Sequence, residues 1–231
     1  EIRTAKETVE KYKPDIILMD GSIIPHYQDR PAKGSKIFDS YKEIISLYKE
    51  FYETCGKNGT ILAGVVEDSR GIRFCNIIRR DMLSKITDSS VPELVKTLER
   101  TRDTGLLYWI LSEGERTDVF RYSDTPEEHS VLRDFGEYAE HVNSFYLKTA
   151  RFDRPIRIDF LGTPDIVEKI SSVVLSISGH HSGYGIPSIL IEADQVAKLS
   201  EEDIENLYSR IISLTGSVPG IMRMRRDMRP F

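Results

Sequence analysis

The chain has 231 residues, of which 39% are hydrophobic and 30% are charged, and its formal net charge at pH 7 is −5. This composition indicates a globular protein with a sizeable core, and its length favours one domain over residues 1–231. The negative charge argues against a protein that coats nucleic acid indiscriminately, although local basic clusters can still bind phosphate. No apolar run approaches membrane-spanning length, so no membrane partner is expected.

The cysteines and the first residue bear on the cellular compartment. Cys55 and Cys75 are the only cysteines, and they show neither a CxxC motif nor zinc-ligand spacing. This usage favours a reducing compartment, and we expect a cytoplasmic protein. The chain begins with Glu1 and no signal-peptide pattern follows, which is compatible with an N-terminally truncated domain.

The first strong signal is an apolar run at residues 16–19, which is bounded by Pro14 and Gly21. It is too short for a globular helix and predicts a buried strand, with Asp20 at its C-terminal end. In open α/β sheets, ligands bind where strands end, and a following glycine allows close backbone approach. The alternative is that Asp20 only caps the turn after the strand.

A second apolar run, residues 60–66, also ends in acids, because Glu67 and Asp68 follow it. Residues 69–71 open a turn, and residues 72–78 form either a strand or a helix. Asp81 stands at the entry to the next element. Its alternative role is to cap a short helix.

Helical periodicity and capping signals predict further elements along the chain. Residues 38–52 carry an aromatic stripe that we interpret as core rather than as a base-stacking platform. We expect a hairpin from residues 106–111 and 118–122, and a strand pair from residues 145–149 and 155–161. Other predicted helices cover residues 2–12, 90–102, 163–177, about 188–197 and 200–214. Together these elements indicate an α/β fold with a mixed sheet and helices packed against it.

Asp20, Glu67 and Asp81 are the acids that we expect to converge on one site. Magnesium and manganese prefer oxygen ligands, and a few carboxylates with water and substrate phosphate complete their coordination. Two such ions can support phosphodiester cleavage by activating water and stabilising the leaving oxygen. Three acids among 37 are not specific by themselves.

The ordered motifs resemble the archaeal NurA nuclease family over almost the whole chain. They are Met-Asp-Gly-Ser at 19–22, Glu-Asp-Ser-Arg at 67–70, Arg-Asp-Met-Leu at 80–83, Gly-Glu-Arg-Thr at 114–117, and the segment 183–197. The resemblance implies a ribonuclease H-like, Piwi-related mixed sheet flanked by helices. It also implies a Mn²⁺-dependent enzyme, with Mg²⁺ as a possible substitute, that has 5′-3′ exonuclease and single-strand endonuclease activity.

The same resemblance implies partners. They are single- and double-stranded DNA ends, a HerA-type hexameric ATPase and a second copy of the chain in a homodimer. The implied process is DNA end resection during double-strand break repair.

The resemblance also assigns site residues by position. Asp20, Glu67 and Asp81 match the family's catalytic acids and metal ligands, with Asp68 as the alternative to Glu67. Tyr146 best matches a catalytic tyrosine, and Tyr138 is the alternative. Asp194 stands where family members often carry a histidine. It is a candidate metal ligand, while His180 or His181 could instead supply a base.

DNA contacts are expected from the basic residues near the acids, namely Arg70, Arg73, Arg79 and Arg80. The alternative is a solvated basic face. Tyr27, Tyr108 and Trp109 are candidates for base stacking but are interpreted first as packing residues. The Met- and Arg-rich tail at 221–231 is a candidate protein interface.

Two functions from different classes therefore remain. The first is a metal-dependent DNA nuclease, and the alternative is a noncatalytic DNA-binding or motor-adaptor subunit with the same fold. A guide-dependent, Argonaute-like nuclease has no support, because no guide-anchoring domain accompanies the core.

Overall fold

The computed structural model describes residues 1–26, 30–32 and 34–215. The chain forms two compact units, residues 1–190 and the segment from Ile191 onward. The sheet and all five strands of the described residues lie in the first unit. Tyr27 and the tail at 221–231 fall outside the described residues, so their predicted roles stay predictions.

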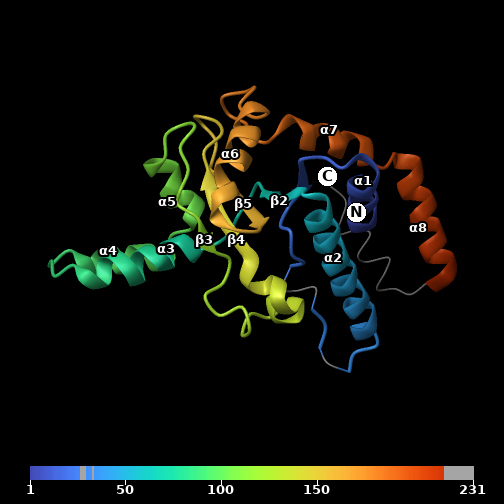
Figure 1. Ribbon diagram of the computed structural model, residues 1–231, viewed down its shortest axis with the longest axis horizontal. Helices are drawn as coiled ribbons and strands as arrows, with labels where there is room; N and C mark the ends of the chain where they lie inside the picture. Colours follow the sequence, from blue (N-terminus) through green and yellow to red (C-terminus); the bar gives the residue numbers. More distant parts are fainter. Residues whose placement is uncertain (27–29, 33, 216–231) are drawn as a thin grey trace. The chain divides into compact units, whose positions relative to one another are not determined.

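One mixed sheet organises the first unit, in the strand order β1-β2-β5-β4-β3 (Figure 1). Its strands are β1 (Ile16–Asp20), β2 (Ile61–Val66), β3 (Phe120–Arg121), β4 (Val142–Leu147) and β5 (Ile156–Leu161). The β1–β2 pair is parallel, whereas β2–β5, β5–β4 and β4–β3 are antiparallel. The predicted mixed α/β sheet is confirmed, as are both apolar strands and the late strand pair. Its ribonuclease H-like assignment stays a prediction.

The register divides the sheet into two faces. Val66, Arg157 and Tyr146 are Cα partners across β2, β5 and β4, and their side is called the Arg157 face. Asp20, Val65 and Ile158 are partners across β1, β2 and β5 and define the Ile158 face. Side chains of partnered residues share a face because successive residues of a strand alternate between faces.

Two helices, α1 (Ile2–Tyr12) and α2 (Phe38–Asn58), pack on the core of the Arg157 face. Tyr52 and Phe51 of α2 are buried with Met19 and Leu62 of the sheet in one cluster. The Tyr52 ring stacks on Phe135 with centroids 5.5 Å apart. The interpretation of the aromatic stripe as core is therefore confirmed.

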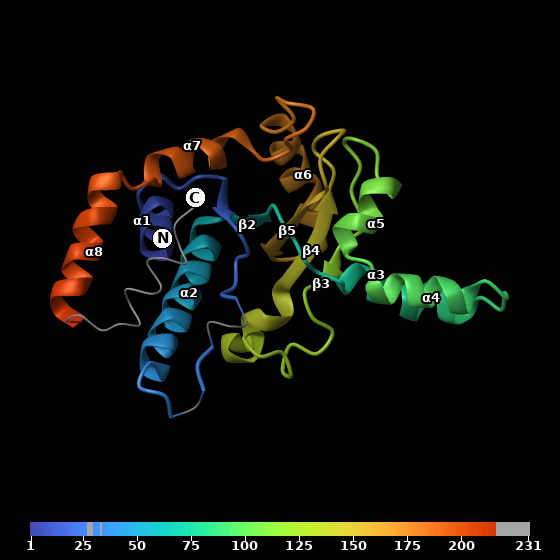
Figure 2. The ribbon, with the colours of Figure 1, turned by 180° about the vertical axis from the view of Figure 1, so that it is seen from behind.

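The segment after β2 is helical. It comprises α3 (Arg73–Ile77), a π-helical turn (Ile78–Met82), a 3-10 turn (Leu83–Lys85) and α4 (Val91–Arg100). Figures 1 and 2 both show α3 and α4 running away from the β3 edge of the sheet. Asp81 lies inside the π-helical turn and does not begin a helix.

The predicted hairpin at 106–111 and 118–122 is wrong. Residues Asp103–Ile110 form α5, whereas Phe120–Arg121 pair with β4 as the short strand β3, and Arg116 forms an isolated bridge with Leu147. A short apolar run has no decisive periodicity, so sequence alone cannot separate a buried strand from a helix. A 3-10 segment, Leu132–His141, then leads into β4.

The later helices agree with the sequence. A 3-10 turn (Pro164–Ile166) precedes α6 (Val167–Ser176), and α7 spans Ser188–Ala197. The last described helix, α8 (Glu201–Thr215), begins at a capping box, in which Ser200 and Asp203 each bind the other's backbone amide at 3.1 Å. Within the described ranges, no helix is long and apolar enough to cross a membrane.

Candidate functional site

The acids Asp20 and Glu67 lie at the C-terminal ends of the parallel strands β1 and β2. Asp20 is the register partner of Val65, and Glu67 stands in the turn directly after β2, where it feels the charge of Asp20. Both side chains are exposed. Gly21, with φ of +93°, turns the chain directly after Asp20, and its amide donates to the Val65 carbonyl at 2.8 Å.

A glycine in β2 makes this turn possible. A Cβ atom on Gly64 would lie 2.4 Å from the Gly21 carbonyl oxygen and 2.8 Å from the Ile23 amide nitrogen. These are backbone atoms that cannot move aside cheaply. Gly64 therefore allows the chain after Asp20 to cross close over the neighbouring strand.

Glu67 lies among like charges. Partial burial, followed by the negative charges of Asp153, Asp20 and Asp68, raises the pKa of Glu67, while Arg154 acts in the opposite direction. The structure thus brings Asp20 and Asp68 near Glu67, whereas the third acid expected at this site, Asp81, is not among the charges that act on Glu67. It also adds Asp153, which sequence reasoning missed.

Asp153 reaches this position through a loop after β4. Its carboxylate accepts a hydrogen bond from the Gly185 amide at 2.8 Å, and the Thr149 hydroxyl donates to the Gly185 carbonyl at 2.6 Å. A Cβ atom on Gly185 would lie 2.3 Å from the Thr149 hydroxyl oxygen, so this contact needs glycine. No local motif marks Asp153, because only the tertiary fold places it near Glu67.

Asp81 lies in a different charged cluster. Arg80 holds it with two hydrogen bonds of 2.8 and 2.9 Å and also pairs with Asp124, which in turn binds Arg73. The hydrogen bond from Arg80 lowers the pKa of Asp81, and Arg73 holds the pKa of Asp124 well below its usual range. The charge on Asp81 is therefore largely satisfied by arginine, and its role as a metal ligand stays a prediction.

The described residues contain no group of three or more His, Cys, Asp or Glu side chains arranged to hold a metal ion. The chemistry at Asp20 and Glu67 nevertheless fits a hard divalent cation, because Mg²⁺-type ions often use one or two carboxylates and take their other ligands from water and phosphate. The crowding of negative charge around Glu67 is the feature that a cation would relieve.

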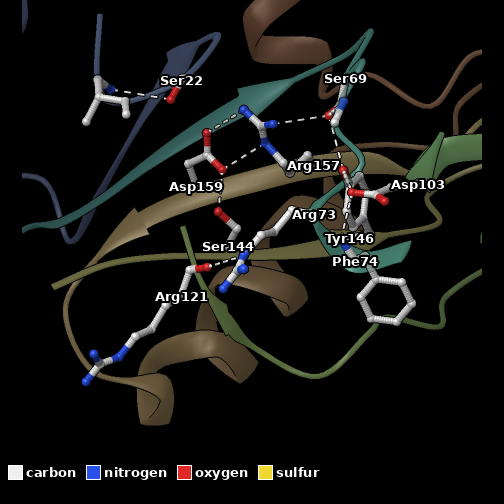
Figure 3. A network of polar contacts seen from close by, with 12 residues as sticks. Ser22, Ser69, Arg73, Phe74, Asp103, Arg121, Ser144, Tyr146, Arg157 and Asp159 are labelled. Atoms are coloured by element: carbon white, nitrogen blue, oxygen red, sulfur yellow. Dashed lines mark hydrogen bonds and ion pairs between the residues drawn. The ribbon is translucent and has the colours of Figure 1, made fainter. Parts of the chain in front are cut away.

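Tyr146 belongs to a buried polar network (Figure 3). Its hydroxyl donates to Asp103 at 2.9 Å and lies 3.2 Å from the Ser69 hydroxyl. Asp103, fully buried, also accepts the backbone amides of Phe74 and Cys75 at 3.0 and 2.9 Å, at the start of α3. The network therefore fixes the segment between β2 and α3.

Burial, followed by the charge of Asp103, raises the pKa of Tyr146. The alternative residue, Tyr138, packs edge-on against Tyr52 with centroids 5.4 Å apart. The catalytic assignment of Tyr146 stays a prediction.

Arg157 extends this network across the Arg157 face (Figure 3). Its guanidinium lies 2.9 and 3.0 Å from the two carboxylate oxygens of Asp159, and it donates to the Ser69 hydroxyl at 3.2 Å. Ser144 donates to Asp159 at 2.7 Å, and the Tyr122 ring lies 5.5 Å from the guanidinium carbon. The two terminal nitrogens of Arg157 make these hydrogen bonds, whereas its buried Nε has no hydrogen-bond partner among the described residues and is held only by its closeness to the charge of Asp159.

A cavity of about 750 Å³ opens beside Arg157. Its wall includes Arg70, Arg102, Arg157, Tyr122, His129 and Ser69. This volume falls within the range of small-molecule sites. The cavity wall also includes Ser22, two residues after Asp20, and Asp68, so the cavity adjoins the strand ends that carry the candidate acids.

The predicted DNA-binding arginines have different environments. Arg73 and Arg80 share Asp124, and Arg79 pairs with Glu99 at 3.0 Å. Arg70 has a side chain that is 78% exposed, and it lies 3.8 Å from Asp68. Of the four, Arg70 is the one on the cavity wall.

The remaining candidates lie on the surface. His180 and His181 are exposed, and His181 accepts the Gly183 amide through Nδ1 at 3.1 Å. Asp194 is exposed on α7 in the second unit. Trp109 is 85% exposed, and Tyr108 lies against the Lys148 ammonium at 4.1 Å from its ring centroid. Stacking on bases stays a prediction for both aromatic residues.

The fold and these acids define a mixed α/β protein with carboxylates at adjoining parallel strand ends. The NurA domain model matches residues 1–199, so the chain belongs to the NurA family. The crystal structure of the NurA nuclease from Sulfolobus solfataricus is similar, with a TM-score of 0.52 and 18% identity. The match covers 100% of this chain and 66% of that chain, and at this identity it shows a shared fold. Comparison with curated proteins found no match.

Proposed function

We propose that this chain is a metal-dependent deoxyribonuclease that hydrolyses phosphodiester bonds, with 5′-3′ exonuclease and single-strand endonuclease activity. The observation that carries the proposal is the placement of Asp20 and Glu67 at the ends of two adjacent parallel strands, with negative charge crowded at Glu67. Membership of the NurA family supports the reaction class.

Asp20 and Glu67 would hold a Mn²⁺ ion, or Mg²⁺ in its place, and Asp153 is positioned to add negative charge. The bound ion would supply Lewis acidity and a lowered pKa for its water ligand. Asp81 and Asp194 remain proposed additional ligands, and Tyr146 a proposed catalytic residue.

The test is degradation of single-stranded DNA with Mn²⁺ by the Asp20→Asn variant. We expect at least a hundredfold loss of rate, because the substitution removes a metal-binding charge while Asp20 is too exposed to support the fold. The matched control is Asp15→Asn, which removes an exposed charge one residue before the opposite end of β1.

Unchanged degradation by Asp20→Asn would contradict the catalytic assignment. It would favour the second candidate, a noncatalytic DNA-binding or motor-adaptor subunit. The observation that favours this noncatalytic candidate is that no three-residue metal-binding group occurs in the described part of the chain. A parent protein that binds DNA without degrading it under Mn²⁺ or Mg²⁺ would establish that alternative.

The proposed partners are single- and double-stranded DNA ends, a HerA-type hexameric ATPase and a second copy of this chain, acting in DNA end resection in the cytoplasm. Family membership is the support for these partners. Co-elution with a HerA-type hexamer tests the ATPase, and removing residues 218–231 should weaken it. Unchanged co-elution after the truncation would contradict the role of the tail, and light scattering of the chain alone tests the dimer.

A further inference from the structure

The loop that carries Asp153 connects β4 to β5, and it is tied to the turn after β2. Arg154 lies 3.0 Å from Asp68, and both side chains are more than half exposed. Strands β2 and β5 are antiparallel, and their last partners are Val66 and Arg157, so the residues just before β5 run beside the residues just after β2. The sheet itself therefore brings Asp153 next to the turn that carries the candidate acids.

A second loop, residues 177–187 between α6 and α7, also holds Asp153. The Gly185 amide donates to one carboxylate oxygen of Asp153 at 2.8 Å, and the Arg154 amide donates to the other at 2.7 Å. The Phe152 amide donates to the Ser182 carbonyl at 2.8 Å, which joins the two loops at another point. Both carboxylate oxygens of Asp153 thus accept a backbone amide, so the direction of the carboxylate is fixed by the two loops.

Two glycines let the 177–187 loop lie close to Thr149. A Cβ atom on Gly179 would lie 2.8 Å from the Thr149 carbonyl oxygen, and one on Gly185 would lie 2.3 Å from the Thr149 hydroxyl oxygen. That hydroxyl donates to the Gly185 carbonyl at 2.6 Å, and Thr149 is only 3% exposed. The contact leaves no room for a larger residue at position 185. Thr149 and Gly185 are therefore positioning residues for Asp153.

The charges around Glu67 show what Asp153 contributes at this position. Burial is the first cause of the raised pKa of Glu67, and the charge of Asp153 comes next, ahead of Asp20 and Asp68. The described residues contain no group of three metal-binding side chains, so Asp153 reaches the site through its charge and not as a third direct ligand. Groups that do not touch a metal ion still change its affinity.

We propose that Asp153 strengthens the binding of a divalent ion at Asp20 and Glu67, and that the Thr149–Gly185 contact holds Asp153 where its charge has this effect. The inference rests on the proposed metal-dependent function and adds to it a residue with no counterpart among the acids expected from the sequence. The 177–187 loop then supports the metal site although none of its residues needs to touch the ion.

The test is Mn²⁺ binding to the full chain without DNA, measured from the electron paramagnetic resonance signal of the free ion. We expect Asp153→Asn to bind Mn²⁺ about tenfold more weakly than wild type, because it removes the charge while the Asn carbonyl oxygen can still accept the Gly185 amide. The matched control is Asp15→Asn, which removes an exposed acid before β1 and should bind as wild type does. An equal loss in this control would show an effect of net charge alone and overturn the proposal. Circular dichroism checks that each variant is folded.

The Gly185→Ala variant tests the loop contact separately. The added methyl group meets the Thr149 hydroxyl, so we expect the Mn²⁺ affinity to fall several-fold. Adding Thr149→Ala removes that hydroxyl and should restore most of the affinity. General damage to the fold would instead be worsened by a second substitution at the buried Thr149. Wild-type affinity in Gly185→Ala, or a double variant weaker than the single one, would overturn the positioning role.

Mn²⁺ binding by Asp20→Asn separates failure of this inference from failure of the proposed function. Equal affinities of Asp153→Asn and wild type, with weaker binding by Asp20→Asn, would overturn the role of Asp153 and leave the metal site standing. Wild-type protein that binds no Mn²⁺, or Asp20→Asn that binds it as tightly as wild type, would overturn the proposed metal site and this inference with it.

Discussion

The acidic groups of the Arg157 network and those of the Asp20–Glu67 pair differ in burial and in their partners. Asp103 and Asp159 are completely buried, and each receives hydrogen bonds from several donors. Asp20 and Glu67 are exposed, and Glu67 lies mainly among other acids. Buried carboxylates that receive several hydrogen bonds serve the fold, whereas exposed carboxylates crowded together repel one another, and a bound cation would lower that repulsion.

The largest effect is expected from Asp159→Ala, which removes a buried carboxylate of the Arg157 network. It leaves the mostly buried Arg157 guanidinium without its carboxylate, so we expect a loss of about 3–5 kcal/mol in the free energy of unfolding. Denaturant titration measures it, with Asp15→Asn as the surface control. A loss below about 1 kcal/mol would show that water or another group replaces the ion pair.

A smaller effect is expected from Tyr146→Phe. The variant keeps the ring and removes one of three hydrogen bonds to the buried Asp103, which costs about 1–3 kcal/mol of stability. If Tyr146 only positions its neighbours, the free energy of unfolding should fall. The kcat and KM for DNA cleavage by the folded variant should then stay close to those of wild type. A hundredfold fall in kcat with unchanged unfolding would instead support the catalytic assignment.

The smallest effect is expected at Glu67. Its raised pKa means that the folded protein binds this proton more tightly than the unfolded chain, so the stability contribution is present at low pH and is lost as pH rises above the ordinary value of 4.5. Glu67→Gln should therefore be slightly more stable than wild type at pH 7 and equal to it near about pH 4. Thermal unfolding at both pH values measures this difference.

Stabilisation by Mn²⁺ tests whether Glu67 contributes to binding a metal ion. An ion bound at the acids should raise the melting temperature of wild type more than that of Glu67→Gln, because ligands that bind only the folded state stabilise it. Equal shifts in both proteins would place the ion elsewhere.

Much of the fold could be predicted from the sequence because the signals are local. The run at 16–19 between Pro14 and Gly21 predicted β1, and the Ser200–Asp203 pair predicted the start of α8. The stretch 106–111 could not be predicted in the same way. Its apolar residues fit either a strand or a helix. In the structure they form α5, and the buried Asp103 at the start of α5 accepts a hydrogen bond from the Phe74 amide of α3.

For the candidate site, the sequence by itself determined that Asp20 and Glu67 end apolar strands, since strand patterning and glycine placement are written in neighbouring residues. Only the tertiary structure decided which groups meet there. The parallel pairing of β1 with β2 brought both acids to adjacent strand ends, the loop after β4 added Asp153, and the π-helical turn joined Asp81 to Arg80 and Asp124. These contacts join residues far apart in the chain, and no local pattern encodes them.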